Sequence, residues 1–138
     1  MQESSFFLIK NNLSDLSEVD EKIKKLLLHK NSTSDLSYKV SLILEELITN
    51  TIKYAYEDDN EHLISIRMTF IENKLKLLVE DDGKYFNISQ APIPNSKKNI
   101  LQMNVGGLGI HLIKSLTNYL RYERINNKNF TEVELNIE

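Results

Sequence analysis

Glu46 and Asn50 are a pair of residues whose types and spacing suggest chemistry. They are four positions apart in a segment with helical periodicity, so their side chains lie one turn apart on the same face of a helix. A carboxylate can accept a proton, and an amide can donate and accept hydrogen bonds. The pair borders the apolar stripe of this helix and can line a cleft, although an isolated Glu and Asn at this spacing are also typical of a solvated helix face.

A second candidate is the carboxylate of Asp81, which ends an apolar strand and is followed by a turn containing Gly83. The alternation of Leu75, Leu77 and Val79 continues onto Asp81 and predicts that its side chain lies on the apolar side of the strand. A carboxylate is costly to bury without hydrogen-bond donors, and an amino group of a ligand could supply one. The simpler interpretation is a turn, because Asp-Gly is a common turn dipeptide.

A third candidate is the run Gly106-Gly107-Leu108-Gly109, which opens a helical pattern. Glycines at a helix start let backbone N–H groups approach phosphate oxygens, and the positive end of the helix dipole adds to the attraction. The run is not a Walker loop, because no Lys-Ser/Thr follows it, and Leu112 stands where a Rossmann fingerprint has its third glycine. An anion site and a flexible hinge into a helix both fit this run.

Periodic patterns predict the elements that must position these residues. Helical spacing predicts a helix from Ser14 to about Lys30 and a second from Leu36 to Tyr56, which carries Glu46 and Asn50. We expect an α+β fold, a two-layer sandwich with a mixed, mainly antiparallel sheet and helices on one face. The predicted order is a strand at Phe6–Lys10, the two helices, a hairpin that begins with a strand at His62–Ile71 and turns at Glu72-Asn73, a loop from Ser89 to Asn104, a helix, and strands at Tyr119–Ile125 and Phe130–Ile137.

Composition restricts the possible classes of function. The 138 residues suit one compact domain, so we expect a single domain spanning 1–138. The formal charge is -3 and the Lys and Arg residues are spread along the chain, which argues against nucleic acid as a ligand. The absence of cysteine excludes disulfides and thiolate metal sites. No apolar stretch approaches the roughly 20 residues of a membrane span, and the N-terminus does not resemble a signal peptide, so we expect a cytoplasmic protein.

In this order and at these distances, the three motifs resemble the N, G1 and G2 boxes of the GHKL ATP-binding superfamily, and specifically its anti-sigma-factor serine/threonine kinases. The combination is far more specific than any one motif. The resemblance runs from the Phe6 strand to the strand that contains Thr131, which is nearly the whole chain. It implies the ATP-binding fold of that superfamily, with ATP and Mg²⁺ as cofactors.

The resemblance also implies a role for each matching residue. Glu46 takes the position of the general base and Asn50 that of the magnesium ligand. One neutral protein oxygen can suffice, because Mg²⁺ keeps several waters and the phosphates as ligands. Asp81 matches the carboxylate that receives the adenine amino group, and Gly83 lets the chain pass close to the base. The remaining matches are Thr131 on the adenine side, Gly107, Leu108 and Gly109 in the phosphate loop, and Tyr54 at the end of the N box.

Some positions depart from the family pattern. Tyr85 stands where a second G1 glycine is frequent, which implies an altered adenine wall or lid start. Tyr54 and Tyr56 close the N box where a histidine is frequent, and we interpret this as a change in packing or stacking. The segment at about 88–106 corresponds to the ATP lid and is short, as in anti-sigma-factor kinases.

The histidines and the acidic run after the second helix have simpler interpretations. His29, His62 and His111 lie in unrelated segments, so we expect no metal cluster, and His111 is predicted to lie on a helix surface. The acidic residues between 57 and 61 are predicted to be exposed to solvent, with contact to a basic partner as the alternative.

The function implied by the resemblance is transfer of the ATP γ-phosphate to a serine or threonine of an anti-anti-sigma protein with a STAS fold, which controls the sequestration of a sigma factor. The first alternative is a binding module that holds a regulator and uses ATP only as a structural ligand. A histidine-kinase-like ATPase ranks third, because the sequence has a single helix before the N box where a phosphoacceptor hairpin would be needed. The apolar strand Phe6-Phe7-Leu8-Ile9 could pair at a sheet edge, so we also expect a homodimer.

Overall fold

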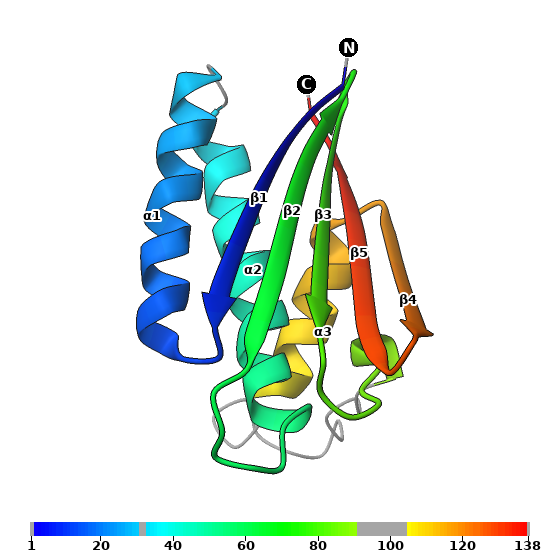
Figure 1. Cartoon of the computed structure of the whole chain (residues 1–138). Coiled ribbons are helices and arrows are strands. Elements are labelled where there is room, and N and C mark those ends of the chain that lie inside the picture. Colours follow the sequence, from blue (N-terminus) through cyan, green and yellow to red (C-terminus); the bar gives the residue numbers. More distant parts are fainter. Residues whose placement is uncertain (1, 31–32, 91–104, 138) are drawn as a thin grey trace.

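A computed structural model describes residues 2–30, 33–90 and 105–137 of the chain. In these residues a strand is followed by two helices, two strands, a short 3-10 helix, a further helix and two strands (Figure 1). The elements are β1 (Gln2–Lys10), α1 (Leu13–His29), α2 (Ser34–Tyr54), β2 (Leu63–Ile71), β3 (Lys74–Asp81), η1 (Ile88–Gln90), α3 (Val105–Leu116), β4 (Tyr119–Ile125) and β5 (Lys128–Asn136).

The strands form a five-stranded sheet in the order β1-β2-β3-β5-β4, and each described pairing is antiparallel. The hairpin between β4 and β5 turns at Asn126 and Asn127, which have positive φ angles of 51° and 63°. Asn adopts this left-handed conformation more readily than most residues, and two successive positive φ angles match the twist of a hairpin. The turn therefore fixes the register in which β4 pairs with β5.

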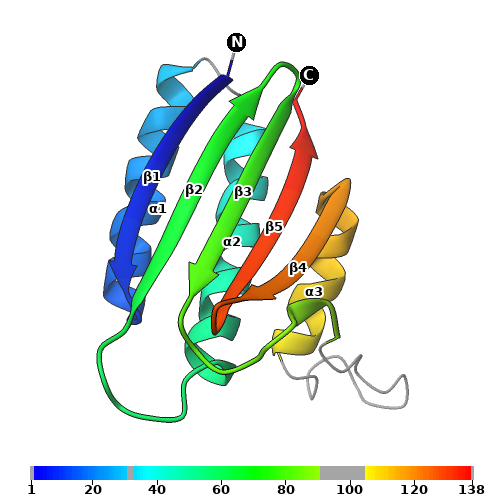
Figure 2. The ribbon, with the colours of Figure 1, turned by 45° about the vertical axis from the view of Figure 1, so that its right-hand side comes forward.

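Three helices cover one face of this sheet, and α2 contacts both α1 and α3 (Figure 2). The side chain of Asn12 caps α1 by accepting the N–H of Asp15, and the side chain of Thr33 caps α2 by accepting the N–H of Leu36. The core lies between the sheet and the helices. Its fully buried side chains include Ile64, Ile66, Met68, Leu75 and Leu77 from the sheet and Ile23, Leu27, Ile43, Leu44, Ile48 and Ile113 from the helices.

The predicted α+β sandwich and the predicted order of elements are confirmed. The described sheet is antiparallel throughout, where a mixed sheet was expected. The second helix ends at Tyr54, before Tyr56, and the 3-10 helix η1 was not predicted. β1 is an edge strand, as expected. Most of the proposed lid lies at 91–104, outside the described residues.

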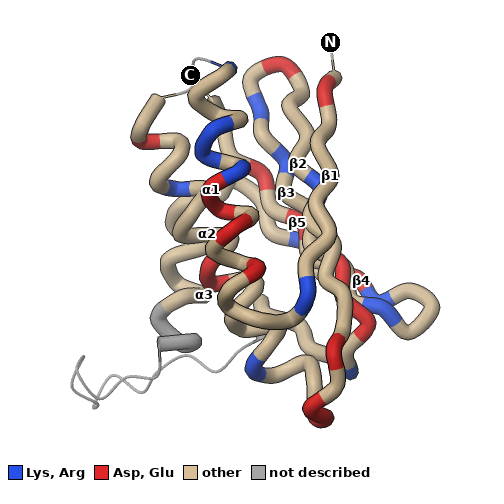
Figure 3. Tube along the Cα trace, turned by 60° about the vertical axis from the view of Figure 1, so that its left-hand side comes forward, with Lys and Arg blue, Asp and Glu red and all other residues tan. Residues whose placement is uncertain are grey.

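Charged residues of both signs are interspersed on the surface. Figure 3 shows acidic positions in the first half of α1, basic positions in its second half, and both signs on the strands. A mixed surface of this kind gives no general attraction for a polyanion. None of the described helices is long and apolar enough to cross a membrane.

Candidate functional site

Three elements that carry the predicted motifs meet at one end of the sandwich. α2 and β3 end there, and α3 begins there, at the end opposite to the chain termini (Figure 1). α2 contacts both β3 and α3. The fold therefore gathers the three motifs around the last turns of α2.

Asp81 is a buried carboxylate at the end of β3, with 5% of its surface exposed. Its direction toward the helices confirms the prediction from the strand alternation. Its Oδ1 accepts hydrogen bonds from the backbone N–H of Gly83 at 2.8 Å and from Nδ2 of Asn129 at 2.9 Å. Burial raises the pKa of Asp81, and the bonds from Asn129 and Gly83 act against this by favouring the charged form. The carboxylate is thus only partly compensated by the protein.

A narrow cavity lies beside this carboxylate. A carboxylate and hydroxyl groups among apolar walls suit a flat heteroaromatic ring that carries an amino group. The cavity has a volume of about 10 Å³, which is room for about one water molecule. A purine can therefore occupy it only after part of the wall moves outward. The lining residues are Leu47, Thr51, Val79, Asp81, Phe86, Ile88 and Thr131.

The turn after Asp81 packs directly on the end of α2. The N–H of Lys84 donates to the carbonyl oxygen of Ala55 at 2.8 Å. A Cβ added at Gly83 would lie 2.5 Å from that same oxygen and 2.6 Å from the Cβ of Ala55. Gly83 is therefore required for the close approach between this turn and α2, and the bond from Lys84 satisfies the carbonyl of the residue that caps the helix.

Glu46 and Asn50 interact one turn apart on α2. Nδ2 of Asn50 donates to the backbone oxygen of Glu46 at 2.7 Å and to its Oε2 at 3.4 Å, which leaves Oδ1 of Asn50 as the atom that could bind a hard cation. Burial is the main cause that raises the pKa of Glu46, followed by the neighbouring charge of Glu45. A raised pKa makes a carboxylate a better proton acceptor. The pair therefore has the chemistry for a base and a magnesium ligand.

The glycine run lies in the first turns of α3, which contain Gly107, Leu108 and Gly109. A Cβ at Gly109 would overlap the carboxylate of Glu46, so the glycine permits the start of α3 to lie against the pair on α2. The free N–H groups and the positive dipole end of a helix start attract phosphate. An anion at this position would lie next to both Glu46 and Asn50.

The remaining predicted site residues are close to the cavity in different ways. Thr131 pairs with Val79 across β5 and β3 and lines the cavity. Tyr54 packs against Phe86 with ring centroids 5.4 Å apart, so it supports a cavity wall from behind. Tyr85 meets Tyr122 edge-on at 5.4 Å. The binding roles assigned to these residues remain predictions.

The comparison with known families agrees with this geometry. The model of the histidine kinase-like ATPase domain matches residues 9–137. The chain belongs to this ATPase family. The match covers nearly all of the chain and confirms the resemblance to the GHKL superfamily.

Curated relatives in this ATPase family carry a more specific name. Serine-protein kinase RsbW of Bacillus subtilis (strain 168) is 29% identical over 96 residues, which make up 66% of this chain and 59% of the relative. Serine-protein kinase RsbW of Staphylococcus aureus (strain MSSA476) is 32% identical over 90 residues, which make up 62% of this chain and 57% of the relative. The matched regions thus span less than two thirds of these relatives.

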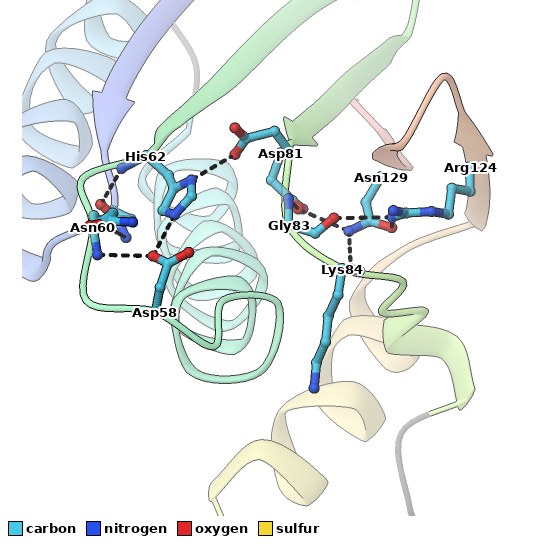
Figure 4. A network of polar contacts seen from close by, with 10 residues as sticks. Asp58, Asn60, His62, Asp81, Gly83, Lys84, Arg124 and Asn129 are labelled. Carbon is cyan, nitrogen blue, oxygen red and sulfur yellow. Dashed lines mark hydrogen bonds and ion pairs between the residues drawn. The ribbon is translucent and has the colours of Figure 1, made fainter.

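A histidine network beside this ATPase site was not predicted from the sequence. Nε2 of His62 lies 2.8 Å from Oδ1 of Asp58, and Nδ1 lies 3.3 Å from Oδ1 of Asp82 (Figure 4). Tyr56 stacks on the His62 ring at 4.2 Å. Because only the imidazolium can donate from both nitrogens, these partners raise the pKa of His62, with the bond to Asp58 as the main cause. The network ties the connection between α2 and β2 to the turn after β3.

The other expectations for these segments can be compared directly. Residues 57–59 and 61 are exposed, as predicted, although Asp58 is engaged by His62. His111 is exposed on α3, as predicted. The described residues contain no group of three or more His, Cys, Asp or Glu side chains placed to hold a metal ion.

Asn129 is a second residue that the sequence analysis missed. It is 1% exposed and lies opposite Asp81 in the pairing of β3 with β5. In the sequence it comes two positions after the turn residues Asn126 and Asn127. Another asparagine at this point looks like a further residue of the same turn. Only the register of the strands reveals that it faces the buried carboxylate.

Substituting Gly83→Ala tests the contact with α2. Because the added Cβ would meet the backbone of Ala55, we expect the free energy of unfolding to fall by about 1–3 kcal/mol, measured by urea denaturation. Lys84→Ala is the control, since it keeps the backbone N–H and removes only an exposed ion pair with Glu57, and it should change stability by less than about 0.5–1 kcal/mol. Equal stability of Gly83→Ala and the wild type would contradict the contact.

Substituting His62→Gln tests the histidine network. The raised pKa of His62 means that its stabilisation is fully present below the unfolded value of about 6.5 and is lost as pH rises through the folded value. We therefore expect the stability difference between wild type and His62→Gln to be larger at about pH 5.5 than at about pH 9. His111→Gln, at an exposed position of α3, is the control for the loss of a histidine outside this network. If the stability difference between wild type and His62→Gln is the same at both pH values, the histidine network is not held by a charged His62.

Proposed function

We propose that this protein is an ATP-dependent serine/threonine protein kinase. The observation that carries this proposal is the position of Glu46, a half-buried carboxylate with a raised pKa that lies beside Asn50 and against the start of α3. A site that only held a nucleotide would need no proton acceptor at this position. The relatives named serine-protein kinase support the same class of activity.

Each residue of the site would have its own role in the transfer of phosphate from ATP. Bound Mg²⁺ would supply positive charge to the phosphates, and Asn50 would hold it through Oδ1. The start of α3, which contains Gly107, would bind the phosphates through backbone N–H groups. Asp81 would accept a hydrogen bond from the adenine amino group. Glu46 would accept the proton of the attacking serine or threonine hydroxyl as the new oxygen–phosphorus bond forms.

The proposed substrate is an anti-anti-sigma protein with a STAS fold, and the proposed setting is the cytoplasm. This part of the proposal rests on the resemblance of the three boxes to those of anti-sigma-factor kinases. In this arrangement the unphosphorylated STAS partner would release a sigma factor that the kinase otherwise sequesters, and phosphorylation would restore the sequestration.

A non-catalytic module that binds ATP and holds a regulator is the second candidate. The observation that favours it is that Gly109 lies against the Glu46 carboxylate, so this carboxylate also packs beside α3. The two candidates differ in whether Glu46 is needed for phosphotransfer or for nothing beyond packing.

Substituting Glu46→Gln distinguishes these candidates. The amide keeps the shape but cannot accept a proton, so we expect transfer of radiolabelled γ-phosphate to a partner protein to fall by about 10²- to 10⁴-fold. ATP affinity, measured by calorimetry, should stay within a few-fold. Glu45→Gln is the matched control, because Glu45 is exposed on the adjacent position of the same helix and should retain the activity.

The pH profile gives a second test of the same role. Because the pKa of Glu46 is raised, the wild-type rate should begin to fall with decreasing pH above the range of an ordinary glutamate. Equal transfer by Glu46→Gln and the wild type would refute the assigned base. Absence of any transfer despite ATP binding would favour the binding module.

We further propose that the protein forms a homodimer through β1. This edge strand carries Phe6 and Leu8, each 55% exposed, and an apolar edge with unpaired backbone groups favours pairing with a second strand. We expect Phe6→Glu to shift the sedimentation coefficient from dimer to monomer. Leu28→Glu, at a 71% exposed position on α1, is the control and should leave the assembly unchanged. A wild-type protein that sediments as a monomer would contradict the proposal.

A further inference from the structure

Asn129 connects the buried carboxylate of the proposed adenine site to an arginine at the edge of the sheet. The strand register places Asp81 of β3 opposite Asn129 of β5, and Asn129 opposite Arg124 of β4. The three residues therefore form one row across the end of the sheet (Figure 4). Asn129 is buried at the centre of this row.

The orientation of the Asn129 amide is fixed by its neighbours. Arg124 has only donors, so the atom of Asn129 that lies 2.8 Å from its NH1 must be the carbonyl oxygen. The same oxygen accepts from the hydroxyl of Tyr122. The amide nitrogen consequently points the other way, toward Asp81 at 2.9 Å and the backbone oxygen of Lys84 at 2.7 Å. Both amide hydrogens have acceptors.

Because of this orientation, the two oxygens of Asp81 have different hydrogen-bond partners. Oδ1 accepts from Asn129 and from the N–H of Gly83, so it must be an unprotonated acceptor. Oδ2 is then the oxygen that is left for a ligand. Arg124 also donates to the backbone oxygen of Gly83 at 3.1 Å, which holds the same turn against the row.

We propose that Asn129, held by Arg124, is a positioning residue that keeps Asp81 presenting an unprotonated Oδ2 to the base and so selects a 6-amino purine nucleotide over a 6-oxo one. The inference rests on the proposed function, in which Asp81 receives the base. An ionised Oδ2 accepts a hydrogen bond from an amino group and repels a carbonyl oxygen. A protonated Oδ2 would donate to the carbonyl oxygen, and the preference would weaken or reverse.

The electrostatic balance of Asp81 supports this role. Burial acts to raise its pKa, and Asp82 acts in the same direction. The hydrogen bond from Asn129 is the foremost influence that favours the charged form, followed by the N–H of Gly83 and the charge of Arg124. Loss of the Asn129 donor removes the interaction that does most to keep Asp81 unprotonated.

The test compares the affinities of Mg-ATP and Mg-ITP, whose bases differ in the amino or oxo group at position 6, by calorimetry at about pH 7. Asn129→Asp keeps the shape and the contact with Arg124 but removes the donor to Asp81. We expect the wild type to prefer ATP by about tenfold or more, and Asn129→Asp to lose most of that preference. The variant should also recover part of the preference as pH rises, because Asp81 then ionises again.

Two further variants separate positioning from a general effect on folding. Val133→Ala removes a buried side chain of the same strand away from the row, so it should lower stability and keep the wild-type ratio of ATP to ITP affinity. Arg124→Met releases the half-buried anchor of Asn129 and should reduce the ratio even if Asn129→Asp does not fold.

The possible results are distinct. An unchanged ATP to ITP ratio in Asn129→Asp, or in Arg124→Met where the first does not fold, would overturn the positioning role and leave the proposed function intact. Proportional weakening of both nucleotides would have the same meaning. A wild type that binds neither nucleotide, or that does not prefer ATP, would overturn the assignment of the adenine site and this inference with it.

Discussion

The burial of the Asp81 carboxylate is the constraint on which the rest of this site depends. A buried charge is unfavourable unless donors surround it, and here the donors are the N–H of Gly83 and the amide of Asn129 on β5, which Arg124 on β4 holds in place. The register of β3, β5 and β4 must therefore be correct to one residue, because a shift would turn Asn129 to the opposite face of the sheet. The paired asparagines of the turn between β4 and β5 fix the register of those two strands, so the conformation of an exposed turn decides whether Asn129 has Arg124 as its partner.

The second constraint is the close approach of backbone to α2 at two points. Gly83 brings the turn after β3 onto Ala55 at the end of the helix, and Gly109 brings the start of α3 onto Glu46. A Cβ at Gly83 would overlap the backbone of Ala55, whereas a Cβ at Gly109 would displace the flexible carboxylate of Glu46. The turn after Asp81 and the start of α3 are thereby packed on the same helix, which brings the proposed base site and the proposed catalytic pair together.

Local patterns in the sequence were sufficient for the elements and for the direction of Asp81, because alternation in β3 and helical spacing in α2 are properties of neighbouring residues. The features that were missed depend on contacts between distant segments. Lys84 bonds to Ala55 after α2, His62 meets Asp82 after β3, and Asn129 acquires its role only through strand pairing. The narrowness of the cavity could not be predicted either, since its walls come from α2, β3, β5 and the segment around Phe86 and Ile88, which meet only in the folded chain. The roles of Glu46, Asn50 and the phosphate-loop glycines remain predictions of the resemblance.

The charge at this end of the molecule explains why the site needs two separate kinds of compensation. Glu46, Asp81 and Asp82 place three acidic groups where the proposed ligand is itself polyanionic. Near the base, the balance comes from Arg124 acting through Asn129 and from His62 acting on Asp82. Near the phosphates, the start of α3 attracts an anion only weakly compared with a divalent cation, and Oδ1 of Asn50 is an atom that could hold such a cation. Phosphate binding beside an ionised Glu46 is therefore expected to depend on Mg²⁺, whereas recognition of the base depends on the row of side chains across the sheet.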